Sequence, residues 1–90
     1  MLAWLEGGGR ADATYKQGEV SGITLLMKAT ANGREQVVEL LLRHGAEINL
    51  QNSNGDTALM VAAYNGHPAT VLRLLRAGAD TKLRAADGKS

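Results

Sequence analysis

Residues 55–67 read GDTALMVAAYNGH, and this stretch decides how the chain folds. Thr57 suits the amino end of a helix, because its side-chain oxygen can accept a hydrogen bond from a backbone N–H of the first turn. The residues that follow tolerate a helix, and Asn65-Gly66 ends it, since Asn and Gly accept the backbone conformation found after helices. The stretch therefore predicts a short helix over Ala58–Tyr64.

A second, longer helix is predicted directly after this one. Pro68 is favourable at a first helical position, where no backbone amide donor is needed. Apolar residues then recur at helical spacing until Gly78 ends the pattern. They are Val71, Leu72, Leu74 and Leu75. Together the two helices form a helix-turn-helix unit.

This unit occurs twice. Gly22, Gly55 and Gly88 are separated by 33 residues each, a period typical of one class of helical repeat. Shifting the chain by that step superposes residues along the whole unit. The matches include Thr24 with Thr57, Leu26 with Leu59, Met27 with Met60, Asn32-Gly33 with Asn65-Gly66, Val38 with Val71, and Gly45-Ala46 with Gly78-Ala79.

The period divides the chain into four parts. Residues 22–54 and 55–87 are expected to be two full repeats, here called the first and second units. Residues 1–21 are expected to be a truncated, irregular repeat remnant with its finger, and residues 88–90 the start of a further repeat. Asn52 and Gly55 suit the first and fourth places of a type I turn, which predicts a projecting hairpin between the units.

The segment Gly55–His67, with Val71, Leu74-Leu75 and Gly78-Ala79-Asp80 after it, resembles the ankyrin repeat, and the likeness extends over residues 22–88. The resemblance implies an all-α repeat fold: an ankyrin-type solenoid of stacked helix-turn-helix pairs joined by β-hairpin fingers. The chain departs from the family's usual Thr-Pro-Leu-His, because the units have Thr24-Leu25-Leu26-Met27 and Thr57-Ala58-Leu59-Met60. Without that proline and histidine, looser fingers are expected.

Composition narrows the possible partners. The chain has 90 residues, no cysteine and a net charge of +1. The core of so small a chain is thin, no disulfide staples it, and thiolate metal sites are excluded. The weak, mixed charge predicts no nucleic-acid partner. No long apolar run or basic leader is present, so we expect no membrane partner and an intracellular location, cytoplasmic or nuclear.

The residues offer no reaction centre, so the chain is predicted not to be an enzyme and to need no cofactor or metal. His44 and His67 lie at a helix end and in a turn, where structural hydrogen bonding is the favoured interpretation. Gly7-Gly8-Gly9 lacks the surroundings of a phosphate-binding loop. A basic stripe is possible, but an ordinary solvated face is the favoured interpretation for it. The stripe would comprise Arg43, Arg73, Arg76, Lys82 and Arg84.

The resemblance implies a partner-binding surface. In ankyrin arrays, finger residues and the ends of first helices line the face that binds other proteins. Tyr64 is the strongest candidate, because the matching residue of the first unit is the small Ala31 and a tyrosine can bury area and still donate a hydrogen bond. Met27 and Met60 are expected to fill the core instead. The candidate set is Ile23, Ala31, Asn32, Gln51, Ser53, Asn54, Asp56, Tyr64, Asn65 and Arg84.

Two functions remain open. The first is a protein-protein interaction module that binds a partner through finger tips and the concave first-helix face. The alternative is an assembly segment that self-associates through its truncated ends, where Leu2, Trp4 and Leu5 are apolar. Resemblance also implies a possible modification: Leu41 followed by Glu47-Ile48-Asn49 is similar to the motif at which ankyrin fingers are hydroxylated on asparagine, here Asn49.

Overall fold

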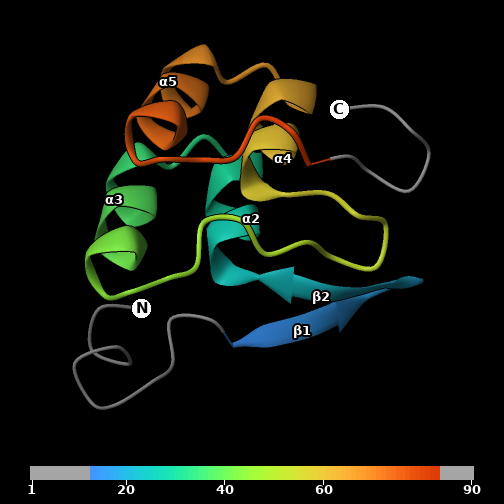
Figure 1. Cartoon of the computed structure of the whole chain (residues 1–90). Coiled ribbons are helices and arrows are strands. Elements are labelled where there is room, and N and C mark those ends of the chain that lie inside the picture. Colours follow the sequence, from blue (N-terminus) through green and yellow to red (C-terminus); the bar gives the residue numbers. More distant parts are fainter. Residues whose placement is uncertain (1–12, 84–90) are drawn as a thin grey trace.

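The computed structural model describes residues 13–83, and this part contains four helices and one two-stranded sheet (Figure 1). The first unit holds α2 (Leu25–Ala31) and α3 (Glu35–Arg43), and the second holds α4 (Ala58–Tyr64) and α5 (Pro68–Arg76). The predicted short helix over Ala58–Tyr64 is confirmed with the same bounds. The described part of the chain thus has a helix-turn-helix repeat fold.

The first helix of each unit begins at a threonine. The Oγ1 atom of Thr24 accepts a hydrogen bond from the backbone N–H of Met27 at 3.1 Å. Thr57 accepts the equivalent bond from Met60 at 3.3 Å. Both threonines are buried. The caps predicted from the sequence are therefore confirmed, and they satisfy backbone donors that a buried helix end would otherwise leave unpaired.

A glycine lies two residues after the last helical residue of the second helix in each unit. Gly45 has φ +87°, a left-handed conformation that glycine adopts without steric cost. Its N–H donates to the carbonyl of Leu42, and Ala46 N–H donates to the carbonyl of Leu41 at 3.0 Å. Gly78 ends α5 with the same pair of bonds. In each unit, these two bonds satisfy carbonyl groups of the last helical turn, and the chain then turns toward the next finger.

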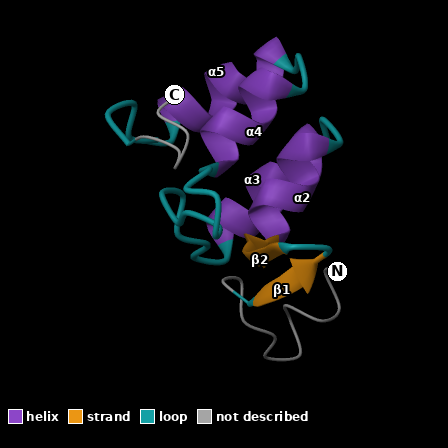
Figure 2. Cartoon of the chain, turned by 90° about the vertical axis from the view of Figure 1, so that its right-hand side faces the viewer, coloured by secondary structure: helices purple, strands orange, loops and turns teal. Residues whose placement is uncertain are grey.

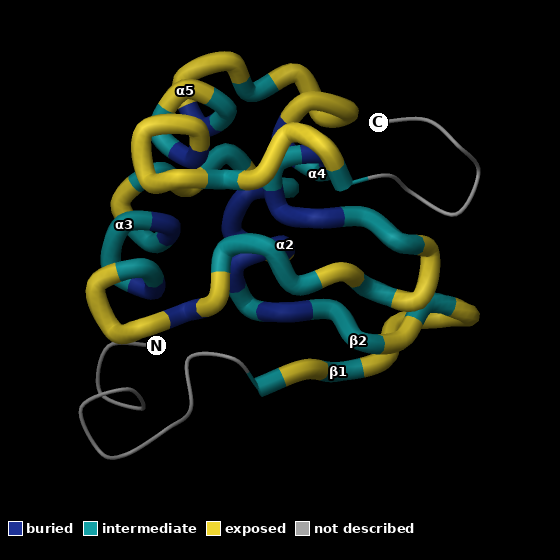
Figure 3. The backbone as a smooth tube through the Cα atoms, viewed as in Figure 1, coloured by how far each residue is buried: buried dark blue, intermediate teal, exposed yellow. Residues whose placement is uncertain are grey.

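The two units pack helix on matching helix. α2 lies against α4 and α3 lies against α5 (Figure 2). One apolar core runs between the helix pairs, and Figure 3 shows the buried residues gathered there. Met27 and Met60 belong to the buried interior, as predicted. The other buried apolar residues are Leu26, Ala29, Val38, Leu41, Ala46, Ala58, Ala62 and Leu74.

The two described fingers differ. β1 (Thr14–Gln17) and β2 (Val20–Thr24) form an antiparallel hairpin before α2. Between the units, the turn at Asn52–Gly55 is confirmed by a bond from Gly55 N–H to the carbonyl of Asn52 at 2.9 Å. The prediction of a β-hairpin there is wrong, because the segment between α3 and α4 contains no strand. Across this segment, the backbone N–H of Asn52 donates to the carbonyl of Asp56, and the side chain of Gln51 donates to the carbonyl of Gly55.

Candidate protein-interaction surface

The two fingers are held together at their tips. The backbone N–H of Ser53 donates to the carbonyl of Ser21 at 2.8 Å. In return, the backbone N–H of Ser21 donates to Oγ of Ser53 at 2.9 Å. Ser21 is in β2 and Ser53 is in the turn between the units, so these two bonds join consecutive fingers.

The second finger is also braced internally. Oδ1 of Asn52 accepts hydrogen bonds from the backbone N–H groups of Asn54 and Asp56, at 2.9 and 3.0 Å. Nε2 of Gln51 donates to the carbonyl of Gly55 at 2.8 Å. Ser53 and Asn54 are exposed at the turn. Hydrogen bonds from neighbouring side chains therefore fix the backbone that carries the exposed finger residues.

The candidate residues at the helix ends form a second group. Asn32 and Asn65 follow α2 and α4, and the side-chain amide of each donates to a carbonyl of its own helix. Tyr64 is 54% exposed. The ring Nε2 of His67 lies 3.1 Å from the carbonyl oxygen of Ala31, which links the second unit to the first. This contact agrees with the structural role predicted for His67.

The structure therefore separates the candidate set into two groups. The finger group comprises Gln51, Ser53, Asn54 and Asp56, with the half-buried Ile23 nearby in β2. The helix-end group comprises Ala31, Asn32, Tyr64 and Asn65. A first helix of seven residues lies between them, a length of about 10 Å. Arg84 lies outside the described residues, as do Leu2, Trp4 and Leu5.

Asn49 has a structural contact. Its Oδ1 accepts a hydrogen bond from the backbone N–H of Asp80 at 2.8 Å. Its own backbone N–H donates to Oε1 of Glu47 at 3.2 Å. The side chain of Asn49 thereby connects the segment that follows α3 to the equivalent segment that follows α5. Hydroxylation of Asn49 stays a prediction.

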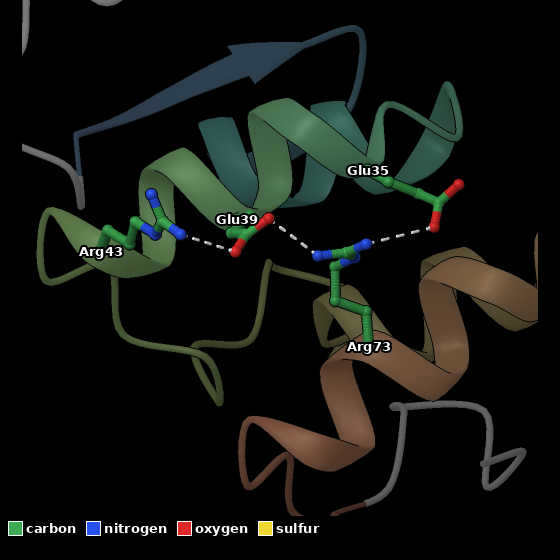
Figure 4. A network of polar contacts seen from close by, with 4 residues as sticks. All are labelled: Glu35, Glu39, Arg43 and Arg73. Carbon is green, nitrogen blue, oxygen red and sulfur yellow. Dashed lines mark hydrogen bonds and ion pairs between the residues drawn. The ribbon is translucent and has the colours of Figure 1, made fainter.

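The side of the molecule formed by the second helices carries an ion-pair network that the sequence analysis missed (Figure 4). Arg73 on α5 donates to Glu39 on α3 at 2.9 Å and lies 3.7 Å from Glu35. Glu39 also pairs with Arg43 at 3.0 Å. Two members of the supposed basic stripe are thus paired with carboxylates. The sequence contained one sign of this network: Arg73 is charged, whereas the matching residue of the first unit is the apolar Leu40.

A family model described as ankyrin repeats (3 copies) matches residues 2–85. The chain belongs to the ankyrin-repeat family. None of the curated proteins compared with it matches significantly. Ankyrin repeats are generally protein-protein interaction modules, and domains built from them are typically not enzymes.

Within residues 13–83, no group of three or more His, Asp or Glu side chains could hold a metal ion. In the same range, no helix has the length and apolar character needed to cross a bilayer. What the arrangement can do is present two joined fingers and two adjacent helix ends to another molecule.

Proposed function

We propose that this ankyrin segment is a protein-protein interaction module that binds a partner across its finger tips and the exposed ends of α2 and α4. The observation that carries the proposal is the reciprocal pair of bonds between Ser21 and Ser53. Because these bonds join consecutive fingers, polar groups on both act as one surface and not as separate loops.

Rigidity supports the same proposal. Binding costs conformational entropy when loops must be ordered, so a surface that is already ordered binds with less loss. The turn at Asn52–Gly55 is closed by backbone and side-chain bonds before any partner arrives. Tyr64 adds exposed aromatic area at the other end of α4, and tyrosine is enriched among residues that dominate binding energies.

We further propose how the repeats are arranged, which activities the chain lacks and where in the cell it is located. The two units form part of a continuous solenoid with repeat boundaries at residues 22–54 and 55–87, and the remnant at 1–21 and the start at 88–90 flank them. The chain itself has no enzymatic activity and binds neither nucleic acid nor membranes. An intracellular location, cytoplasmic or nuclear, is also proposed, and cell fractionation would check it.

The test is quantitative affinity capture with mass spectrometry, comparing the wild type with Tyr64→Ala and with Asn54→Ala. Proteins that bind the proposed surface should be captured several-fold less by either variant. Gln36→Ala is the matched control, because Gln36 is exposed on α3 and is not among the residues of the proposed surface. Capture unchanged in both surface variants, or lost equally in the control, would contradict the proposed surface.

Self-association is a second candidate function, and one specific observation favours it. Leu72 and Leu75 on α5 are 48% and 42% exposed. They do not belong to the finger surface, so self-association and partner binding can occur together.

A further inference from the structure

Three asparagines of the chain are followed directly by glycine: Asn32-Gly33, Asn54-Gly55 and Asn65-Gly66. In such a pair, the backbone nitrogen of the glycine can attack the side-chain carbonyl carbon of the asparagine, because glycine has no side chain that hinders the approach. The asparagine then loses its amide. The dipeptide is the same in all three pairs, so the fold decides which pair reacts.

The glycine nitrogens do not distinguish the three pairs. Gly33, Gly55 and Gly66 all have positive φ, at +65°, +80° and +70°. Each glycine donates its N–H to a backbone carbonyl, at 3.2 Å from Gly33 and Gly66 and at 2.9 Å from Gly55. In every pair, the nitrogen can attack only after that bond opens. The difference must come from the asparagine side chain and from the cost of opening the turn.

Two of the asparagine side chains are held by the helices that they follow. Nδ2 of Asn32 donates to the carbonyl of Lys28 at 3.1 Å, and Nδ2 of Asn65 donates to the carbonyl of Val61 at 2.8 Å. Each amide must give up this bond before it can turn toward the glycine. Asn54 is exposed, and its side-chain amide makes no hydrogen bond within the part of the chain that the structure describes.

The turns after α2 and α4 are also anchored to buried helical residues. The backbone N–H of Arg34 donates to the carbonyl of Ala29 at 2.9 Å, and that of His67 donates to the carbonyl of Ala62 at 3.0 Å. Ala29 and Ala62 are 5% and 0% exposed. Opening either turn therefore disturbs a helix end that is packed in the core, which raises the free energy of opening.

The turn between the units is closed by bonds at the surface. Nε2 of Gln51 donates to the carbonyl of Gly55 in an exposed bond. The bond from the N–H of Ser21 to Oγ of Ser53 is exposed as well. Bonds at an exposed loop tip open at a lower free energy than bonds in a packed core. This finger is ordered on average, yet it should open more often than the two helix ends.

We propose that Asn54 is a site of spontaneous deamidation in the folded protein and that it reacts before Asn32 and Asn65. The nitrogen of Gly55 loses its proton to solvent and forms a bond to Cγ of Asn54. The bond from Cγ to Nδ2 breaks, and the leaving nitrogen takes up a proton and departs as ammonia. Water then hydrolyses the cyclic imide at either carbonyl, which gives aspartate or isoaspartate. Water is the sole co-reactant, and nothing is oxidised or reduced.

Both products change the tip of the finger. Each replaces a neutral amide by a carboxylate, which takes the formal net charge of the chain from +1 to zero. Isoaspartate also adds one atom to the main chain before Gly55, so the four-residue turn that Gly55 closes with Asn52 cannot keep its geometry. The effect on a partner rests on the proposed function: a binding surface that includes Asn54 should lose affinity as the protein reacts.

Peptide mass spectrometry of the folded full chain, sampled during incubation in neutral buffer, tests the order of reaction. Oxygen-labelled water that is present only during the incubation marks the deamidation that precedes digestion. Fragmentation should locate the label at position 54 several-fold faster than at Asn32 or Asn65. Asn54→Gln has a longer side chain that cannot close the same ring, so position 54 of this control should remain unlabelled.

The same incubation in urea tests whether the fold sets the order. The lead of Asn54 should disappear there, because the three pairs then share the same local chemistry. The proposal is overturned if Asn32 or Asn65 reacts as fast as Asn54 in the folded protein. It is also overturned if the lead of Asn54 persists unchanged in urea, since the sequence and not the structure would then set the rate.

Affinity capture with fresh and incubated protein separates this inference from the proposed function. Incubated wild type should capture less partner than fresh wild type, whereas incubated Asn54→Gln should match its own fresh sample. Fast reaction at Asn54 with unchanged capture supports the modification site and contradicts the proposed partner surface. Slow reaction at Asn54, with capture still lowered by Asn54→Ala, overturns the modification site and supports the partner surface.

Discussion

At the scale of single residues, the contact between Gly33 and His67 shows how a turn in one unit depends on the next. Gly33 ends the turn after α2 with φ +65°. A Cβ atom at this position would lie 2.8 Å from Nδ1 of the His67 ring. The glycine thus serves both the backbone conformation and the close approach of a side chain from the second unit.

Gly33→Ala should accordingly lower the free energy of unfolding by more than the usual cost of a left-handed alanine, which is about 1 kcal/mol. Gly18→Ala is the matched control, because Gly18 has φ +61° and nothing within 4 Å of its Cβ position. Urea denaturation followed by circular dichroism measures both variants. Equal losses in the two variants would mean that the His67 ring moves aside without cost.

At the scale of elements, Arg73 connects α5 to α3 through Glu35 and Glu39. The side chain of Arg73 is 39% exposed, and those of Glu35 and Glu39 are 42% and 44% exposed. Solvent therefore screens the pairs, and each exposed pair contributes at most about 1 kcal/mol. Apolar packing between the helices contributes the larger part of the attraction, since the core continues across both units.

Arg73→Met should reduce stability by about 1 kcal/mol or less at low salt, because methionine keeps part of the apolar stem and loses the charge. The difference from wild type should shrink at high salt, which screens such pairs. Arg76→Met is the control, since Arg76 makes no ion pair within the described residues. Thermal melts at low and high salt measure both variants. A loss that does not change with salt would assign the role of Arg73 to packing.

At the scale of the whole molecule, one core serves both units. Leu41 of α3 and Leu74 of α5 are 0% exposed and belong to the same buried cluster. Neighbouring repeats stabilise each other through such interfaces, so the described units should unfold together.

Leu41→Ala should cost about 2 to 5 kcal/mol, because it removes buried methyl groups and leaves a cavity. The loss should also speed amide hydrogen exchange in α5, although the substitution is in α3. Gln36→Ala, exposed on the same helix, should change neither quantity appreciably. Urea denaturation with residue-resolved exchange measures the effect. Faster exchange confined to the first unit would show that the two units unfold separately.

Local signals were sufficient to predict the helices of the described chain. Threonine caps, Pro68 and the glycines after each helix act on backbone groups a few residues away, so the sequence alone located α4 and the ends of the second helices. The same logic predicted the turn at Asn52–Gly55. The prediction of strands around that turn was wrong. Strands require backbone hydrogen bonds between the two arms, and here the side chain of Gln51 supplies one of the bonds instead.

The contacts that define the surfaces were decided only by the tertiary structure. Arg73 with Glu39, His67 with Ala31, and Ser21 with Ser53 join residues 34, 36 and 32 positions apart. Whether such pairs meet depends on how one unit stacks on the other, which no local pattern contains. The 33-residue period determined the repeat. Stacking then decided which carboxylates are paired, how the candidate residues divide into two groups, and that Leu72 and Leu75 are exposed, because burial belongs to the assembled fold.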